Sequence, residues 1–250
     1  MSLRRPADTF TVTGLGVPFL QYRPTLENWR TELSVAETYH ALLNSTGIAV
    51  ATTVLALLLG VPAAYALARF RFHLIKNKDI VTWFLSQRVL PPVVTVLPFY
   101  LIMRTLHLLD TQAALIIANT TFNLPFAVVI LRQTFLDLPL ELEEAALVDG
   151  ATPFSTFWHV ARPLAQPAIM AAGLIILAFT WNEFLFALTI GRLDAITLPV
   201  RIAGTAYSVR GVQFWYVSTQ ALLAIIPPTV LALLAQRYVV RGLTLGAVKG

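Results

Sequence analysis

Cysteine is absent from the 250-residue chain, and charged residues make up only 12% of it. Without thiols the chain can form no disulfide, thiolate metal site, iron–sulfur cluster or catalytic cysteine. Its four histidines lie far apart in the sequence and never share a helix face at a spacing of four residues, so they indicate no metal site. The sequence also offers no nucleophile constellation. We therefore expect no catalytic residues, no bound metal and no enzymatic activity in this chain.

Apolar surface is what the sequence has in excess. Hydrophobic residues form 57% of the chain and the mean hydropathy is +0.71. A soluble domain has roughly 45–50% apolar and about 25% charged residues. A surface with so little charge excludes a disordered chain, argues against an ordinary soluble enzyme, and indicates contact with membrane lipid. We interpret the net charge of +5 as basic cytoplasmic loops and not as a nucleic-acid-binding surface.

Five stretches are long and apolar enough, or nearly so, to cross a bilayer, which takes about 20 residues in a helix. They lie at about 42–68, 80–103, 111–131, 164–190 and 213–235. Prolines predict kinked helices, above all in the second stretch, with Pro91, Pro92 and Pro98, and in the fifth, with Pro227 and Pro228. The expected fold is an all-α membrane protein, a polytopic bundle of five spans. Residues 1–40 are expected to be a polar N-terminal segment, and 41–250 the membrane domain.

The segment 132–163 between the third and fourth spans holds five of the thirteen acidic residues. Leu138-Pro139 favours a helix over 140–148, and Asp149-Gly150 favours a turn after it. Thr152 and Pro153 suit the N-cap and first position of a second short helix through Val160, which Pro163 should end. We expect two short helices bent at a glycine, forming a compact knob outside the membrane. The aromatic residues that it would expose are Phe154, Phe157 and Trp158.

One motif in this segment is specific. Glu144-Ala145-Ala146 is followed by Gly150, Val160 and Pro163 at the spacing of the EAA loop. The surrounding run EEAALVDGATPFSTFWHVARPLAQPAI resembles permease subunits of bacterial carbohydrate ABC importers, the maltose-type branch of the binding-protein-dependent transport inner membrane components. LPPVVTVLPFYLI, the run WNEF and the C-terminal GLTLGAVKG strengthen the resemblance, which covers roughly residue 24 to the end.

The resemblance implies a multi-pass permease subunit of an ATP-driven sugar importer in the bacterial inner membrane. Such a subunit forms half of the translocation pathway and works by alternating access. Its implied partners are a homologous second permease, two ATP-binding subunits and an extracytoplasmic solute-binding protein. ATP and Mg would be held by the ATP-binding subunits, with no cofactor in this chain.

The 132–163 loop would then be a cytoplasmic helix-turn-helix that couples the permease to the ATPase. Small residues there allow close approach, the glycine permits the sharp turn, and Glu144 supplies a charge for a basic partner or a cap. The C-terminal tail, 236–250, would reach toward the ATPase as well. The predicted coupling residues are Glu144, Ala145, Ala146, Asp149, Gly150, Phe154, Phe157 and Lys249. The alternative is an ordinary amphipathic connector, which the additional motifs disfavour.

Arg88 and Glu183 are the ionisable residues well inside the predicted spans, where charge is costly and a functional role is the default hypothesis. Their predicted depths differ by about 16 Å at 1.5 Å per residue, so we expect no direct ion pair between them. Aromatic stacking and amide hydrogen bonds suit sugar recognition. The residues that offer them are Trp181, Asn182, Asn119 and Asn123. Helix–helix hydrogen bonding is the alternative for all of them, and we favour it for the last two.

Basic residues support a topology with a cytoplasmic 132–163 loop, because nine would then lie inside and four outside between the spans. The N-terminal segment, with four arginines, would lie outside and offset most of this bias. The family usually has six spans with both ends inside, and we favour a start-site effect over true loss of the first helix. The rival function is a stand-alone secondary transporter or channel for a small polar solute. Such folds usually carry internal repeats, which we do not find.

Overall fold

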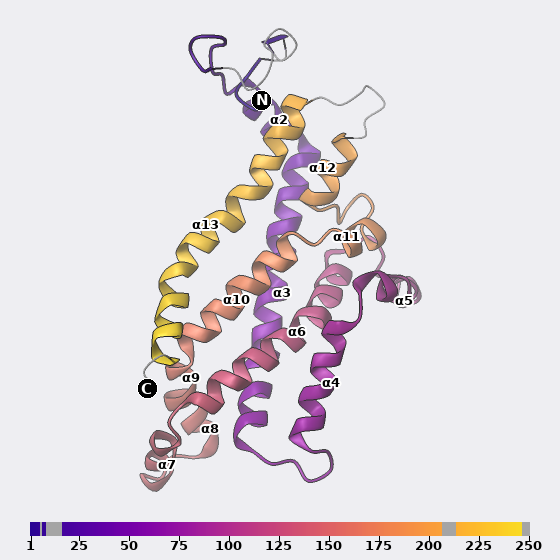
Figure 1. Cartoon of the computed structure of the whole chain (residues 1–250). Coiled ribbons are helices and arrows are strands. Elements are labelled where there is room, and N and C mark those ends of the chain that lie inside the picture. Colours follow the sequence, from indigo (N-terminus) through magenta and orange to yellow (C-terminus); the bar gives the residue numbers. More distant parts are fainter. Residues whose placement is uncertain (6, 9–16, 207–213, 247–250) are drawn as a thin grey trace. The chain divides into compact units, whose positions relative to one another are not determined.

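The protein is all-helical in the computed structural model, which describes residues 1–5, 7–8, 17–206 and 214–246 (Figure 1). No β-strand occurs in these ranges, so the predicted all-α fold is confirmed. The helices are α2 (Glu27–Ser34), α3 (Ala36–Arg69), α4 (Asn77–Val89), α5 (Pro92–Thr105), α6 (Gln112–Asp137), α7 (Leu140–Val148), α8 (Pro153–Thr156), the π-helical turn η1 (Phe157–Ala161), α9 (Arg162–Leu164), α10 (Gln166–Trp181), α11 (Leu185–Ile190), α12 (Leu198–Ala206) and α13 (Phe214–Gly246).

Three helical segments are long and apolar enough to cross a membrane singly: α3, α6 and Phe214–Leu233 of α13. Two further helix pairs pass the same test together but are bent, α4 with α5 by 95° and Pro153–Leu164 with α10 by 73°. By length and composition the described chain therefore has three spans, or up to five if each bent pair counts as one. The number five stays a prediction.

Two predicted spans are interrupted, which corrects the sequence analysis. The stretch 80–103 is not one kinked helix, because Leu90 is extended (φ −66°, ψ 122°) between α4 and α5. A residue before proline is driven out of the helical region, and Pro91 follows Leu90. The stretch 164–190 also breaks, since α10 ends at Trp181 and α11 begins at Leu185. By contrast, α13 continues as helix through Pro227 and Pro228.

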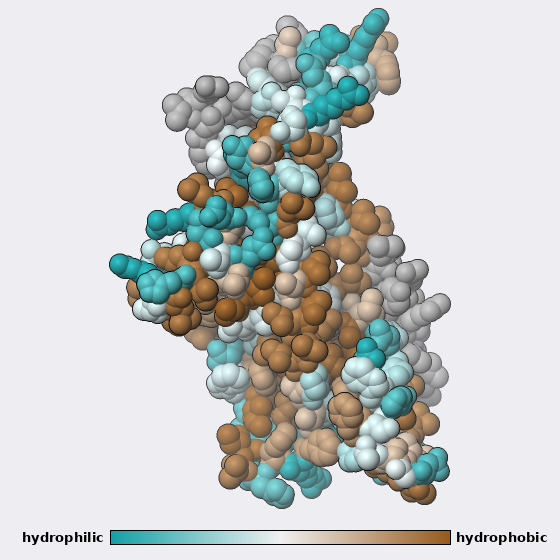
Figure 2. All heavy atoms as spheres, turned by 180° about the vertical axis from the view of Figure 1, so that it is seen from behind, coloured by the Kyte–Doolittle hydropathy of each residue, from teal (hydrophilic) through white to brown (hydrophobic). Residues whose placement is uncertain are grey.

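Apolar side chains cover much of the face drawn in Figure 2. Among the described residues, several large apolar side chains are more than half exposed, including Val54 (57%), Leu58 (65%) and Val93 (68%). Exposed surface of this kind contacts acyl chains in a bilayer, where it costs nothing in hydration. The excess of hydrophobic residues in the sequence therefore lies largely on the lipid-facing surface and only partly in the core.

The chain divides into two compact units. Unit 1 comprises Met1–Ile48, Tyr100–Leu115 and Trp181–Thr229, and unit 2 comprises Ala49–Phe99, Ile116–Thr180 and Val230–Gly250. The connections predicted to lie outside, 106–111 and 191–197, both belong to unit 1. The segments predicted to be cytoplasmic, 69–79 and 132–163, both belong to unit 2. The N-terminal segment also belongs to unit 1, and the side of the membrane on which each segment lies stays a prediction.

Unit 2 has a core of small and aromatic residues on α3, α6, η1 and α10. Gly60 of α3 lies so close to α6 that a Cβ atom there would stand 2.8 Å from the Cβ of Ala127. Small residues at such contacts let membrane helices approach each other closely. Farther along the same helices, Tyr65 and Phe135 are buried, with 7% and 0% of their surfaces exposed. Because of these contacts, α3 and α6 form the rigid pair of helices against which the predicted knob packs.

In unit 1, polar side chains hold the N-terminal segment and the 191–197 connection. The Nε2 of Gln220 donates to Oε1 of the buried Glu32 at 2.6 Å. The Nδ2 of Asn44 donates to the carbonyls of Asp194 and Ile196 at 2.7 and 2.9 Å. The N-terminal segment is therefore folded against α13 by a buried hydrogen bond, although its composition is polar.

Asp110 organises the same connection with a single carboxylate. Its oxygens accept hydrogen bonds from the backbone N–H groups of four consecutive residues, 192–195, at 2.7 to 3.2 Å. Burial acts to raise the pKa of Asp110, but these four amides outweigh it and the pKa lies below its usual range. The folded protein thus stabilises the ionised form of Asp110.

We expect Asp110→Asn to loosen residues 192–195. Asn tolerates the left-handed conformation of this position (φ 60°), so the variant removes the charge and leaves the backbone unstrained. Loss of charge-assisted hydrogen bonds should cost about 1 to 3 kcal/mol locally. A lowered folded-state pKa stabilises above the unfolded value of about 3.9 and is lost as the pH falls through the folded value. Hydrogen exchange, corrected for intrinsic rates, should therefore show the amides of residues 192–195 unprotected in the variant at pH 7. In the wild type the same amides should lose their protection only below about pH 4. Equal protection at pH 7 would contradict the role of the carboxylate.

Candidate functional site

The knob, defined as residues 138–164, lies beyond the C-terminal end of α6 (Figure 1). Its first helix, α7, spans Leu140–Val148, as predicted. Gly150 then adopts φ +88°, a left-handed conformation that favours glycine, and its N–H donates to the carbonyl of Leu147 at 3.1 Å. The hydroxyl of Thr152 accepts from the N–H of Ser155 at 3.2 Å, with Pro153 at the first helical position. The predicted glycine turn and Thr152 cap are confirmed.

The second helical run of the knob is longer than predicted. It continues from α8 through the π turn η1 into α9 and ends at Leu164, so Pro163 does not terminate it. Proline normally clashes with the carbonyl four residues earlier. A π turn is wider than an α turn, and η1 immediately precedes α9, which gives the proline ring room. The prediction that Pro163 ends the helix was wrong because it assumed regular α-helical geometry.

A buried ion pair fixes the knob to the end of α3. The carboxylate of Glu143 receives two hydrogen bonds at its Oε1, 2.9 Å from Nε and 2.7 Å from Nη2 of Arg69. The hydroxyl of Tyr65 donates to Oε2 at 2.8 Å. Glu143 is 4% exposed, so both charges of the pair are largely removed from water. The Nη2 of Arg69 also donates to the carbonyl of Leu138 at 3.3 Å, at the entry to the knob.

The buried role of Glu143 was not predicted from the sequence, and the proposed partner contact of Glu144 stays a prediction. Glu144 is exposed, whereas Glu143 makes the contacts to α3. The resemblance to the EAA pattern pointed to Glu144, and two adjacent glutamates on a short helix give no other signal of which one is buried. Only the direction of α7 relative to Tyr65 and Arg69 distinguishes them.

Phe157 is buried, which corrects the expectation that the knob presents it. It is 8% exposed, and its ring centroid lies 4.8 Å from that of Tyr65 and 6.4 Å from that of Phe135. It begins the π turn and points into the core that α3 and α6 form. Phe157 therefore attaches the knob to the bundle.

The exposed face of the knob is apolar with acidic residues beside it. Val148 and Phe154 are 87% and 73% exposed, and Trp158 is 47% exposed. The rings of Phe154 and Trp158 stack with centroids 6.4 Å apart and planes 15° apart, and the guanidinium of Arg162 lies 4.4 Å from the centroid of Trp158. Of the other predicted coupling residues of the knob, Glu144, Ala145 and Asp149 are exposed and Ala146 is half-buried. A rigid exposed patch of this kind is typical of a protein–protein contact.

The pathway candidates in unit 2 have polar partners of their own. The Nδ2 of Asn123 donates to the carbonyl of Asn119 at 2.9 Å and to the hydroxyl of Thr180 at 3.3 Å, and both asparagines are 4% exposed. Only the Asn123–Thr180 bond joins two helices, α6 and α10, whereas the carbonyl of Asn119 accepts from within α6. Arg88 is exposed, with its guanidinium 5.5 Å from the ring centroid of Phe126 and 5.6 Å from that of Phe179.

The pathway candidates in unit 1 surround the break between α10 and α11. The indole N–H of Trp181, 4% exposed, donates to the carbonyl of Ala224 at 3.0 Å. The carboxylate of Glu183 accepts from the N–H groups of Phe186 and Ala187 at 2.7 and 3.0 Å, so it caps α11. Glu183 thus lies in a break and not within a continuous span. Asn182 lies beside it in the break, while Lys249 lies outside the described residues.

These features define a class: a polytopic helical membrane protein with a helix-turn-helix knob attached to its bundle. In the described ranges no group of three His, Cys, Asp or Glu is arranged to hold a metal. Residues 3–245 match the family "Binding-protein-dependent transport system inner membrane component", and the chain belongs to this family. It is accordingly a transport component of the inner membrane and not an enzyme.

Several relatives are transport permeases with named substrates. The chain is 41% identical to the trehalose transport system permease protein SugB of Mycobacterium tuberculosis, over 84% of this chain and 77% of that protein. It is 35% identical to the sulfoquinovosyl glycerol transport system permease protein SmoH of Agrobacterium fabrum, over 94% and 81%. The trehalose/maltose permease MalG of Thermococcus litoralis is 34% identical, over 95% and 86%.

The fold also matches solved transporters. A bacterial ABC transporter that imports the acidic polysaccharide alginate has a TM-score of 0.75 at 23% identity, covering 95% of this chain and 86% of the matched one. The MetNI methionine ABC transporter in an inward-facing conformation has a TM-score of 0.64 at 20% identity, covering 82% and 95%. At these identities the likeness concerns the fold alone.

Proposed function

We propose that this chain is one of two permease subunits of an ATP-driven carbohydrate importer, and that its knob couples substrate movement to ATP hydrolysis in partner subunits. The observation that carries the coupling role is the buried attachment of the knob through Glu143 to Arg69 and Tyr65. A segment that has to transmit force needs such a rigid attachment on one side and a free contact surface on the other. The exposed stacked pair of Phe154 and Trp158 supplies that surface.

The carbohydrate class rests on the relatives. SugB, SmoH and MalG are named for trehalose, sulfoquinovosyl glycerol, and trehalose or maltose, all of them glycosides, at 34% to 41% identity. The partners would be a second permease, two ATP-binding subunits and an extracytoplasmic binding protein. ATP and Mg would be bound by the ATP-binding subunits, where hydrolysis supplies the driving force.

Coupling would proceed by rigid-body movement of packed elements. A displacement of the ATP-binding subunits would press on Val148, Phe154 and Trp158. Because α7 is hydrogen-bonded to α3 and η1 is packed on Tyr65 and Phe135, the knob would carry these helices with it. Ala145, Ala146, Glu144 and Asp149 would shape the contact, with the acids facing basic groups of the partner.

For the pathway we propose Arg88, Asn119, Asn123, Trp181, Asn182 and Glu183, with different roles. Arg88 is exposed beside two phenylalanine rings and is suited to hydrogen-bond the hydroxyl groups of a sugar. Trp181 and Glu183 would shape the break between α10 and α11, since Trp181 is hydrogen-bonded to α13 and Glu183 caps α11. Broken helices are where transporters commonly place substrate groups.

The coupling surface can be tested by Phe154→Ser. Truncating one well-packed aromatic contact typically costs about 1 to 2 kcal/mol of binding, or about five- to thirtyfold in affinity. We expect the variant permease to co-purify poorly with the ATP-binding subunits, while it retains its own thermal stability because Phe154 is 73% exposed. The matched control is Phe214→Ser, an exposed phenylalanine of α13 outside the knob.

Measurements on the wild-type chain separate the two functions. Recovery of the wild-type permease with ATP-binding subunits, and stimulation of their hydrolysis by the binding protein and a sugar, support the importer. Sugar transport by this chain alone in proteoliposomes without ATP would establish the stand-alone transporter instead. Family membership already favours the importer, since the family is defined by dependence on a binding protein.

A further inference from the structure

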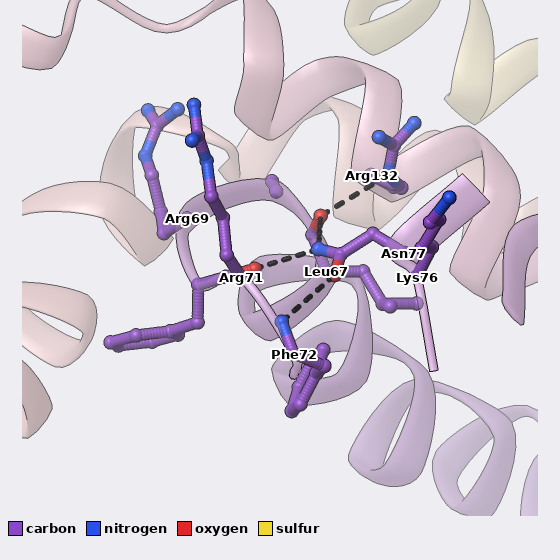
Figure 3. A pocket seen from close by; sticks show the side chains of 9 residues that line it. Leu67, Arg69, Arg71, Phe72, Lys76, Asn77 and Arg132 are labelled. Atoms are coloured by element: carbon purple, nitrogen blue, oxygen red, sulfur yellow. Dashed lines mark hydrogen bonds between the residues drawn. The ribbon is translucent and has the colours of Figure 1, made fainter. Parts of the chain in front are cut away.

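The connection between α3 and α4 closes around a pocket of about 490 Å³, lined by Leu67, Ala68, Arg69, Phe70, Arg71, Phe72, Lys76, Asn77 and Arg132 (Figure 3). Asn77 holds its wall in shape. Its Nδ2 donates to the carbonyls of Leu67 and Phe70 at 3.0 and 2.6 Å, and its Oδ1 accepts from the N–H of Phe72 at 3.1 Å. The pocket is therefore a folded feature of unit 2.

The pocket carries uncompensated positive charge. Of the four cations that line it, Arg69 is neutralised by Glu143. Arg71 and Lys76 are exposed and make no ion pair with any described residue. Arg132 donates one hydrogen bond, from its Nε to the carbonyl of Leu67 at 3.3 Å. In Figure 3 the guanidinium groups of Arg71 and Arg132 extend to the same side as that of Arg69. Three net positive charges around one pocket fit a phosphate group.

Apolar side chains frame the same pocket. Phe70 and Phe72 are 47% and 45% exposed, and the adjoining Leu74 and Ile75 are 100% and 57% exposed. Ile75 continues into an apolar groove of about 400 Å³ with Asp79, Ile80 and Trp83. A soluble anion would leave these apolar side chains in contact with water. A lipid has both a charged headgroup for the basic residues and an acyl chain for the apolar ones. The connection also begins directly after Arg69, the last residue of a helix long and apolar enough to cross a membrane. Basic residues at the cytoplasmic ends of such helices are typical of the headgroup region.

We propose that Arg71, Lys76 and Arg132 bind the phosphate of an anionic phospholipid whose acyl chain lies along the groove of Ile75, Ile80 and Trp83. Basic pockets beside spanning helices are suited to lipid phosphates, and each cation near the surface strengthens the attraction about fivefold. The site requires only that the chain resides in the inner membrane, and it stands apart from the coupling role proposed for the knob.

The test is a native mass spectrometry titration of the assembled importer in detergent with short-chain phosphatidylglycerol. We expect wild-type complexes to bind it at least tenfold more tightly than phosphatidylcholine of the same chain length. The variant Arg71→Gln/Lys76→Gln should bind it about 20- to 30-fold more weakly, since both side chains are exposed and their loss leaves the fold intact. The matched control Lys78→Gln/Arg104→Gln removes two exposed charges outside the pocket and should change the affinity less than threefold.

Four results would overturn the proposal. Equal affinity for phosphatidylcholine would remove headgroup selection, and equal affinity for glycerol 3-phosphate would make this a site for soluble phosphates. Equal losses in the two double variants would show diffuse surface charge. Phosphatidylglycerol binding that emerges only after the ATP-binding subunits are dissociated would make the pocket a protein interface. None of these readouts depends on transport, so failure here and failure of the coupling role are distinguishable.

Discussion

Replacing Glu143 with leucine is expected to destabilise the permease by about 3 to 5 kcal/mol, because the variant leaves the guanidinium of Arg69 buried without its partner. For a chain of this size that corresponds to a fall of about 6 to 20 °C in the apparent Tm. Surviving complexes should hydrolyse ATP without importing sugar, since the knob would no longer move with α3. Thermal unfolding, ATPase and uptake measurements on one reconstituted preparation check both effects.

Glu141→Leu is the matched control for this variant. It removes the same charge from the same helix, but Glu141 is exposed. The double variant Arg69→Met/Glu143→Leu should be more stable than either single variant, because it removes both buried charges together. Wild-type stability and coupling in Glu143→Leu would refute the structural role of the pair. Equal losses in Glu141→Leu would attribute the effect to net charge.

Gly150→Val is expected to have the second-largest effect. A β-branched residue at φ +88° costs about 2 to 3 kcal/mol of backbone strain, although no neighbouring atom lies within 4 Å of the position that a Cβ would occupy. The turn should relax by reorienting α7 against α8. We expect uncoupled hydrolysis or loss of the ATP-binding subunits from the complex, measured by ATPase activity, uptake and co-purification.

Two substitutions separate strain from bulk at this turn. Gly150→Asn should lie between wild type and Gly150→Val, because asparagine tolerates the left-handed region. Gly204→Val adds the same side chain to α12 at another position where a Cβ would meet nothing within 4 Å, without a positive φ. It should leave coupling unchanged. Normal sugar uptake by Gly150→Val would contradict the requirement for this turn.

Local features of the knob were predictable from the sequence because each depends on a few consecutive residues. The limits of α7, the Gly150 turn and the Thr152 cap follow from turn chemistry and capping. The lengths of α3 and α6 follow from apolar runs that a bilayer requires. In each case the signal lies within the element itself.

Features that depend on distant contacts were not predictable in the same way. Glu143 is buried because Tyr65 and Arg69, 78 and 74 residues away in sequence, lie against it. Phe157 is buried because it packs on Tyr65 of α3 and Phe135 of α6, and hydropathy alone does not distinguish it from the exposed Phe154. The break between α4 and α5 was signalled by Pro91 and Pro92, but the 95° bend depends on packing that a single sequence does not encode locally.

The attachment of the knob to α3 also makes that helix a lever. The part of α3 within unit 2, Ala49–Arg69, is about 31 Å long at 1.5 Å per residue. Arg69, the last residue of α3, is paired with Glu143 of the knob. A tilt of about 10° imposed at the knob would therefore displace the far end of this segment by about 5 Å. A displacement of that size equals the rise of one full helical turn. With the coupling role proposed for the knob, a small rotation of the ATP-binding subunits would be enough to exchange one set of helix contacts for the next.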